Sequence, residues 1–279
     1  MKQIIKKGSF LTLMFLLLGC LSLYAADNDL ITKQITIKLK KAGTLPDRIT
    51  DSERYKITNL KIIGEINGTD WKMIRWMAGS GFSYGKLSVL DLSEAKIVEG
   101  GDYYYYANYG YYYTSNDVIG FCAFCDCRRL TRLTLPAGIT KIGEYAFWGC
   151  SGLTSLTLPD GITWIDYEAF RGCSGLTSIY VYAEKVPEIG SNAFEGVDAK
   201  KCTLYVPMGT RDDYWISDIG SYFENIVEFD ATGIDKTTIS ADVEEVARYS
   251  VNGLRLSAPT KGLNIVKYSD GSVKKVAVQ

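Results

Sequence analysis

A 23-residue repeat in the middle of the chain is the feature that most constrains its fold. Three consecutive segments align along their length: AFCDCRRLTRLTLPAGITKIGEY, AFWGCSGLTSLTLPDGITWIDYE and AFRGCSGLTSIYVYAEKVPEIGSN. Their Ala-Phe pairs begin at residues 123, 146 and 169, and a fourth pair, Ala193-Phe194, follows after 24 residues. Each copy carries an apolar stripe that it cannot bury alone, so we expect successive copies to stack on one another.

The spacing of apolar residues within a copy predicts the type of stack. Leucines and their aliphatic substitutes follow the pattern L-x-x-L-x-L, which is typical of leucine-rich repeats of 20–29 residues. One short strand per copy, paired with the next at about 4.8 Å, would build a parallel concave sheet. The recurring phenylalanines should form an inner aromatic column: Phe124, Phe147, Phe170 and Phe194. The fold class predicted is therefore α+β, a leucine-rich-repeat solenoid.

Weaker patterns on either side of the repeats predict caps and a separate module. Alternation over residues 35–39 indicates an opening strand, and Asp70 stands as an N-cap before a helical apolar stripe. Asn252-Gly253 and Asp270-Gly271 suit two-residue hairpin turns in a small β module. The predicted parts are a signal peptide (1–26), an N-terminal cap (27–58), the solenoid (59–228) with a Tyr-rich insertion (99–117), a linker (229–242) and a β-hairpin module (243–279).

The N-terminus has the pattern of an export signal. Three lysines precede fourteen uncharged residues, FLTLMFLLLGCLSL, a run too short to span a membrane comfortably. Leu17-Leu18-Gly19-Cys20 resembles a lipobox, in which Cys20 would be acylated and become the new N-terminus. Cleavage near Ala25 or Ala26 is the alternative. In both cases we expect an exported protein, with membrane attachment only through a lipid on Cys20.

Composition excludes several kinds of chemistry. The chain of 279 residues has no histidine, which excludes Ser-His-Asp and Cys-His catalysis and histidine-bound metals. A net charge of −1 gives no electrostatic footprint for nucleic acid. Paired carboxylates could still serve a glycosidase, but Glu65, Asp91 and Glu94 show no spacing that selects a pair. We therefore expect no enzyme and no cofactor.

The cysteines allow a metal or disulfide interpretation, and the repeat offers a simpler one. Cys127, Cys150 and Cys173 lie one period apart, which predicts a structural ladder of buried, reduced thiols with poor geometry for disulfides. Cys122 and Cys125 keep a zinc or disulfide alternative open, but zinc sites usually pair such spacings on opposed loops, so no metal is assigned. In an apolar column without partners, Cys150→Ser would cost about 1–3 kcal/mol.

Two surfaces are candidates for binding. The segment DYYYYANYGYYY interrupts the repeats, and tyrosine is favoured in binding loops because it has a rigid apolar ring and a polar tip. The alternative is that its rings pack on the solenoid flank as a cap. The candidates in this segment are Tyr103, Tyr104, Tyr105, Tyr106, Tyr109, Tyr111, Tyr112 and Tyr113. Because no run of like charge accompanies the rings, we expect affinity to depend little on salt.

The concave face of the sheet is the second candidate surface. It carries mostly neutral hydroxyl side chains, together with Arg132, Tyr180 and Tyr205. The alternative is that this face is simply exposed to solvent and binds nothing.

Several segments of the sequence together resemble a known protein family. GEINGTDWKMIRWMAG, KLSVLDLSEAKIVEGGD, the AFxGCxxLTSLTLP repeats and LYVPMGTRDDY…FENIVEF are similar to the BspA-like leucine-rich-repeat surface proteins of Gram-negative anaerobic bacteria. The tail YSVNGLRLSAPTKGLNIVKYSDGSVKKVAV also resembles the β-rich C-terminal segments of such exported proteins, though it is shorter than a type IX sorting tail. The resemblance implies surface display, adhesion to host or microbial partners, and no catalytic residues.

Three functions of different classes follow. The leading hypothesis is a cell-surface or secreted adhesion protein that binds a host or microbial surface protein or glycan. The second is a structural or accessory surface component of the outer membrane that binds nothing itself. The third is a glycan-active enzyme.

Overall fold

The chain forms two compact units that divide at residues 234 and 235. The computed structural model describes residues 29–81, 83–107, 110–231, 245–250, 255–256, 258, 262–268 and 273–278. The predicted signal peptide, with Cys20, and residues 232–242 of the predicted linker lie outside the described residues.

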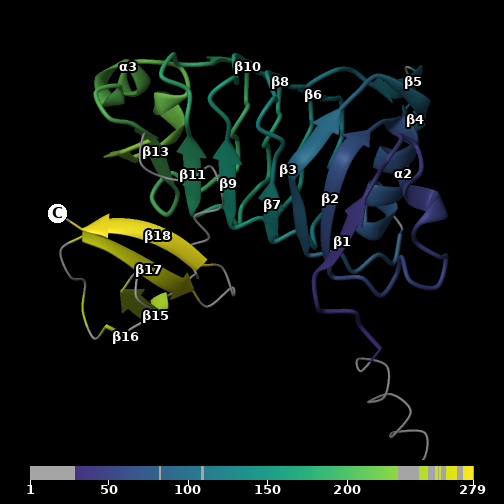
Figure 1. The fold of residues 1–279 in the computed structure, drawn as a ribbon. Helices are drawn as coiled ribbons and strands as arrows, with labels where there is room; N and C mark the ends of the chain where they lie inside the picture. The colour runs from purple at the N-terminus through teal and green to yellow at the C-terminus, as the bar shows by residue number, and fades with distance from the viewer. Residues whose placement is uncertain are drawn as a thin grey trace, which may run out of the picture. The chain divides into compact units, whose positions relative to one another are not determined.

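The first unit is built on a parallel sheet of eight strands (Figure 1). In spatial order these are β1 (Ile35–Lys38), β2 (Asn59–Ile66), β3 (Val89–Ile97), β7 (Arg132–Thr134), β9 (Ser155–Leu158), β11 (Ser178–Val181), β13 (Thr203–Pro207) and β14 (Asn225–Phe229). Arg132 pairs with Ser155, and Ser155 pairs with Ser178, so corresponding residues of successive copies lie side by side. The repeat region is thus a solenoid of parallel strands with few helices.

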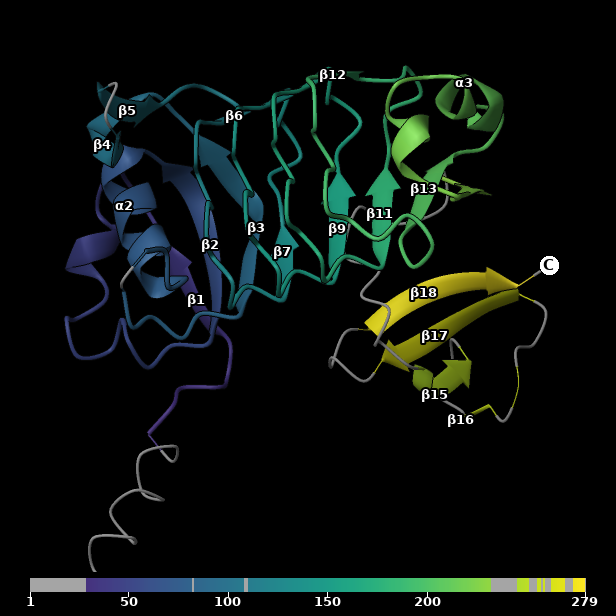
Figure 2. The same cartoon turned by 180° about the vertical axis from the view of Figure 1, so that it is seen from behind.

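A second parallel sheet of two-residue strands runs along the same stack (Figure 2). Its order is β12 (Glu188–Ile189), β10 (Trp164–Ile165), β8 (Lys141–Ile142) and β6 (Val118–Ile119). Threonine hydroxyls add bonds between copies at the turns before the larger strands. Thr177 donates to the carbonyl of Thr154, and Thr154 donates to that of Thr131, both at 3.1 Å. Each copy is therefore tied to the preceding one by side chains as well as by the backbone.

The aromatic column expected from the repeats is confirmed. Phe124, Phe147, Phe170 and Phe194 are buried and stack in sequence, with ring centroids 5.2, 4.9 and 5.0 Å apart. The column continues past the repeats at both ends. Trp71 lies 5.3 Å from Phe124, and Phe223 lies 5.3 Å from Phe194. The flanking segments therefore cover the apolar ends that the stack alone would leave open.

Helix α2 (Gly68–Met77) covers the first end, and its N-cap differs from the prediction. Asn67 is the N-cap: its side chain accepts from Thr69 N at 3.1 Å, while Asp70 is the N3 residue of a capping box. The buried Asp70 carboxylate accepts from the backbone N–H groups of Asn67, Gly43 and Leu45 at 2.9, 2.6 and 2.8 Å. Asp70 thus fixes the helix start to the preceding loop, which includes the short helix η1 (Leu45–Asp47).

The Tyr-rich insertion forms an antiparallel hairpin of β4 (Gly100–Ala107) and β5 (Gly110–Thr114). The hairpin contacts α2, at the β1 end of the stack (Figures 1 and 2). Short helices α3 (Arg211–Trp215) and η2 (Gly220–Tyr222) cover the other end. There the buried Tyr214 donates its hydroxyl proton to the carbonyl of Ala183 at 2.7 Å.

The second unit contains one antiparallel sheet of four strands. Its order is β16 (Arg255–Leu256), β15 (Glu245–Ser250), β17 (Gly262–Tyr268) and β18 (Val273–Val278). The turn residues that predicted the two hairpins, Asn252-Gly253 and Asp270-Gly271, lie outside the described residues. Val266, on β17, is buried.

Candidate functional site

One set of hairpin tyrosines packs against the first unit. Tyr104 is buried, lies 6.5 Å from Trp71, and donates its hydroxyl proton to the carbonyl of Phe121 at 2.9 Å. The half-buried Tyr112 stacks on Phe121 with centroids 4.1 Å apart. The half-buried Tyr105 ring lies under the guanidinium of Arg75, 4.7 Å from the ring centroid. These three tyrosines hold the hairpin in place.

A second set of hairpin tyrosines faces solvent. Tyr106, Tyr111 and Tyr113 are each more than half exposed. Tyr111 contacts both Tyr106 and the half-buried Tyr103, at centroid distances of 4.9 and 4.7 Å. Tyr109 lies outside the described residues. The hairpin therefore presents a cluster of rings that its anchoring side chains leave uncovered.

The exposed rings continue across helix α2 onto the loop before β2. Lys72 Nζ lies 4.4 Å from the ring centroid of Tyr103 and 5.8 Å from that of Trp76, which is 42% exposed. On the other side of Trp76, the guanidinium of Arg54 lies 5.3 Å from the indole and 4.7 Å from the ring of Tyr55. We call this set the aromatic–cationic surface: Arg54, Tyr55, Lys72, Trp76, Tyr103, Tyr106 and Tyr111.

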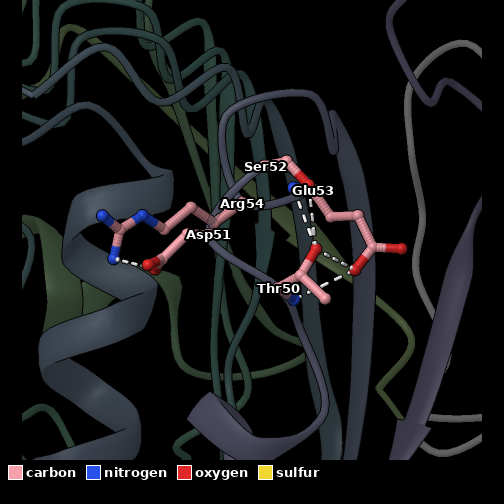
Figure 3. A network of polar contacts seen from close by, with 5 residues as sticks. All are labelled: Thr50, Asp51, Ser52, Glu53 and Arg54. Carbon is pink, nitrogen blue, oxygen red and sulfur yellow. Dashed lines mark hydrogen bonds and ion pairs between the residues drawn. The ribbon is translucent and has the colours of Figure 1, made fainter.

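A hydrogen-bonded turn positions Arg54 (Figure 3). Asp51 Oδ1 lies 3.0 Å from Arg54 Nη1, and Thr50 donates to Glu53 Oε2 from its backbone N–H and hydroxyl at 3.0 and 2.7 Å. The side-chain and backbone hydrogen bonds from Thr50 lower the pKa of Glu53. The turn therefore holds the guanidinium beside α2, which reduces the side-chain entropy that binding would cost.

Sequence reasoning missed four members of this surface. Lys72 and Trp76 are four residues apart, so they are neighbours on one face of a helix, while Trp71 and Ile74 are buried. An exposed tryptophan opposite the buried stripe was the available signal. Arg54 and Tyr55 carried no comparable signal, because they lie on an irregular turn whose packing against α2 depends on tertiary structure.

The sheet-face candidates form a separate group near the other end of the stack. Tyr180 and Tyr205 stack with centroids 4.4 Å apart and planes inclined by 9°. Phe229 meets Tyr180 edge-on at 5.8 Å, and burial raises the pKa of Tyr180. Arg132 is exposed on β7, with β9 between it and the strand of Tyr180. The structure thus brings the two tyrosines together but joins neither Arg132 nor the hairpin to them.

Comparison with protein families agrees with this architecture. Residues 101–214 match the BspA type leucine rich repeat region in six copies. The chain carries a BspA-type leucine-rich-repeat region. The resemblance that its motifs indicate is thereby confirmed, and no curated protein matches the chain. Across the described residues, every helix is too short or too polar to cross a membrane.

The repeat cysteines of the BspA-like region are structural in their contacts. Cys127, Cys150 and Cys173 are buried and unpaired. Cys150 Sγ donates to the carbonyl of Phe124 at 3.0 Å, and Cys173 Sγ donates to that of Phe147 at 3.1 Å. The described residues hold no group of three or more His, Cys, Asp or Glu side chains arranged to bind a metal.

The carboxylates considered for glycan hydrolysis have a different environment from a catalytic pair. Asp91 and Glu94 both contact Lys61 Nζ, at 3.1 and 2.7 Å. Lys61 therefore lies between the two carboxylates and pairs with both of them. This arrangement fits an ion-pair network on the sheet surface.

Proposed function

We propose that this BspA-like protein is an exported binding protein that recognises a surface glycan or protein through the aromatic–cationic surface. The observation that carries the proposal is the unbroken series of contacts from Tyr55 through Arg54, Trp76 and Lys72 to the hairpin rings. BspA-type leucine-rich repeats are interaction scaffolds, and repeat regions of this kind are generally non-enzymatic.

The physical properties of the surface suit a carbohydrate chain. Exposed tyrosine and tryptophan rings offer flat apolar faces for stacking, and their polar tips can hydrogen-bond to hydroxyl groups. Their side chains have few rotatable bonds, so little entropy is lost when a ligand binds. An exposed aromatic cluster of this kind carries a risk of aggregation unless a partner covers it.

The two cations change the expected electrostatics of binding. The prediction of weak salt dependence rested on the absence of like charge next to the tyrosines in the sequence. Lys72 and Arg54 come from other segments and lie among the rings. Arg54 is paired with Asp51, whereas Lys72 forms no ion pair among the described residues. We therefore propose an anionic ligand, such as a glycan with carboxylate or sulfate groups, whose affinity falls as salt rises.

The stacked pair on the sheet, Tyr180 and Tyr205, supports a second contact area for a long ligand. Their rings are parallel and half-buried, so they are already held in a fixed orientation.

The alternative function is a structural surface component without a ligand. It is favoured by the packing of Tyr104 and Tyr112 against the first unit. The experiment below separates binding from that alternative.

The test compares binding and stability in matched variants. Wild-type protein is applied to an array of neutral and acidic glycans and matrix proteins. Tyr106→Ser/Tyr111→Ser and Trp76→Ser should lose most of the binding with little change in melting temperature. Trp215→Ser is the control, because Trp215 is also exposed and beside an arginine, Arg211, but lies on α3. Equal loss in the control, or a large fall in stability with the tyrosine variant, would contradict the proposal.

Export and anchoring form a separate part of the proposal. The basic segment and apolar run of residues 1–26 support removal of this segment on export. Palmitate labelling of wild type that disappears in Cys20→Ser would support a lipoprotein on the outer membrane. Unlabelled protein in the medium would instead support simple cleavage and secretion.

A further inference from the structure

Arg75, on α2, is a buried cation with an unusual set of partners. Its side chain is 5% exposed, and Nη1 donates to the backbone carbonyls of Cys122 and Ala123, the second at 2.8 Å. Nη2 donates to Ser80 Oγ at 2.8 Å and to Cys125 Sγ at 3.6 Å. Among the described residues, no carboxylate forms an ion pair with Arg75.

A buried guanidinium without an anion is costly, because burial removes the water that stabilises its charge. Carbonyl and hydroxyl oxygens compensate only in part. Among the groups to which Arg75 donates, the Cys125 thiol is the only acid. A thiolate at Cys125 would supply the missing negative charge at 3.6 Å.

Cys122 and Cys125 lie at the first and fourth positions of one turn. The Cys125 N–H donates to the Cys122 carbonyl at 3.2 Å, which closes a tight turn. Such a turn brings its first and fourth Cα atoms within about 7 Å, and disulfides span about 4.4–6.8 Å between Cα atoms. The two cysteines are 7% and 6% exposed, whereas Cys127, Cys150, Cys173 and Cys202 are at most 1% exposed.

The two thiols differ in acidity. Cys122 keeps its proton, whereas Cys125 loses its proton more easily and can act as the nucleophile. The hydrogen bond from Cys122 and the charge of Arg75 lower the pKa of Cys125 to about 6. The same hydrogen bond and burial raise the pKa of Cys122. By contrast, burial raises the pKa of Cys127 to about 12. The titratable groups that face Cys125 are Arg75 from α2, Tyr104 and Tyr105 from β4, and Cys122, Asp126 and Cys127 from its own segment.

We propose that Cys122 and Cys125 form a redox-active dithiol that exchanges with small disulfides, with Cys125 as the nucleophile and Cys122 as the resolving thiol. The Cys125 thiolate attacks one sulfur of the external disulfide, forms a mixed disulfide and releases one thiolate. Cys122 gives its proton to that thiolate, directly or through water, and attacks Cys125 sulfur. The second external thiolate leaves and takes a proton from solvent. Two protein sulfurs are oxidised and the two sulfurs of the external disulfide are reduced.

The position of Arg75 determines which redox state is favoured. It stabilises the thiolate of the reduced pair and loses its anion when the disulfide forms. Stabilisation of the reduced form makes a disulfide a stronger oxidant. The Cys122–Cys125 disulfide should therefore be reduced more easily than a structural disulfide.

The first experiment measures alkylation of the reduced full-length protein by iodoacetamide as a function of pH, with mass-spectrometric mapping of each cysteine. Cys125 should react with a midpoint near pH 6, as its pKa of about 6 requires. Cys127 serves as the internal control, because it is buried in the same segment and should remain unmodified in the folded state. Arg75→Met should raise the Cys125 midpoint.

The second experiment uses oxidised and reduced glutathione, and it does not depend on the Arg75 variant folding. Wild type should form a Cys122–Cys125 disulfide that returns to the dithiol as the glutathione ratio falls. Cys122→Ser should accumulate a glutathione adduct on Cys125, and Cys125→Ser should leave Cys122 unmodified. If Cys125 is as unreactive as Cys127 and the folded protein forms no adduct or disulfide, the proposal is wrong.

Discussion

The Cys150 thiol donates a hydrogen bond to the backbone carbonyl of Phe124, one repeat earlier, with the sulfur and oxygen 3.0 Å apart. Cys173 makes the same bond to Phe147 at 3.1 Å. The thiols therefore link successive copies of the repeat through polar contacts. The sequence-based expectation that a hydroxyl at position 150 would lack a partner is wrong, because a carbonyl acceptor lies within reach.

We expect Cys150→Ser to be milder than the same change at Cys202. Both residues are buried, but no described residue accepts a hydrogen bond from the Cys202 thiol. A serine at 150 can donate to the Phe124 carbonyl, whereas a serine at 202 would bury an unsatisfied hydroxyl. The loss of unfolding free energy should be greater at 202 by about 1 kcal/mol. Urea denaturation of the two variants measures the difference, and equal losses would show that the thiol bond has no role.

The hairpin should show a sharp contrast between its buried and exposed tyrosines. Tyr104→Phe removes a buried hydroxyl and leaves the Phe121 carbonyl without that donor, which should cost about 1 kcal/mol. Tyr106→Phe, at an exposed ring, should change stability by less than about 0.5 kcal/mol. Thermal unfolding measures both. A similar effect at the two positions would mean that Tyr104 does not anchor the hairpin.

Periodicity revealed the stack because it is a local signal repeated many times. Phe147 and Phe170 lie in equivalent positions of successive copies, so one alignment places both in the core. Asp70 shows where such reasoning fails. An acidic residue before a helical stripe suits both the N-cap and the N3 position, and the choice depends on the backbone N–H groups of Gly43 and Leu45 that the carboxylate reaches.

The candidate site was predictable only where its residues are adjacent in the chain. The tyrosines of 103–113 stand out in the sequence, yet nothing there separates the buried Tyr104 from the exposed Tyr106. Arg54 and Lys72 reach the rings from two other segments, so their part in the surface needed the folded structure. The same holds for Arg75 and Cys125, which are far apart in sequence but in contact.

Asp70→Ala should be among the most destabilising single changes outside the repeats. It leaves three backbone N–H groups without their acceptor, and those of Gly43 and Leu45 come from a different segment than the helix. We expect a loss of about 3 kcal/mol of unfolding free energy. Asp47→Ala is the control, because Asp47 is exposed and lies on the neighbouring turn. If chemical denaturation shows equal losses for the two variants, Asp70 does not join the helix to the loop.

Stability should rise with pH from about 6 to 9 because of Cys125. The folded thiol has a pKa of about 6, below the ordinary value of 9.0, so within this window the unfolded chain binds a proton that the folded chain has lost. Stability then increases with pH, and the contribution disappears as pH falls through about 6. The chain has no histidine, so few other groups titrate in this range.

Above about pH 9 the raised pKa of Cys122 lowers the stability, because Cys122 loses its proton in the unfolded chain but keeps it in the folded chain. Urea denaturation at several pH values should give this rise in the reduced wild type and a flatter profile in Cys125→Ser. An equal slope in both proteins would show that Cys125 is not a thiolate in the folded state.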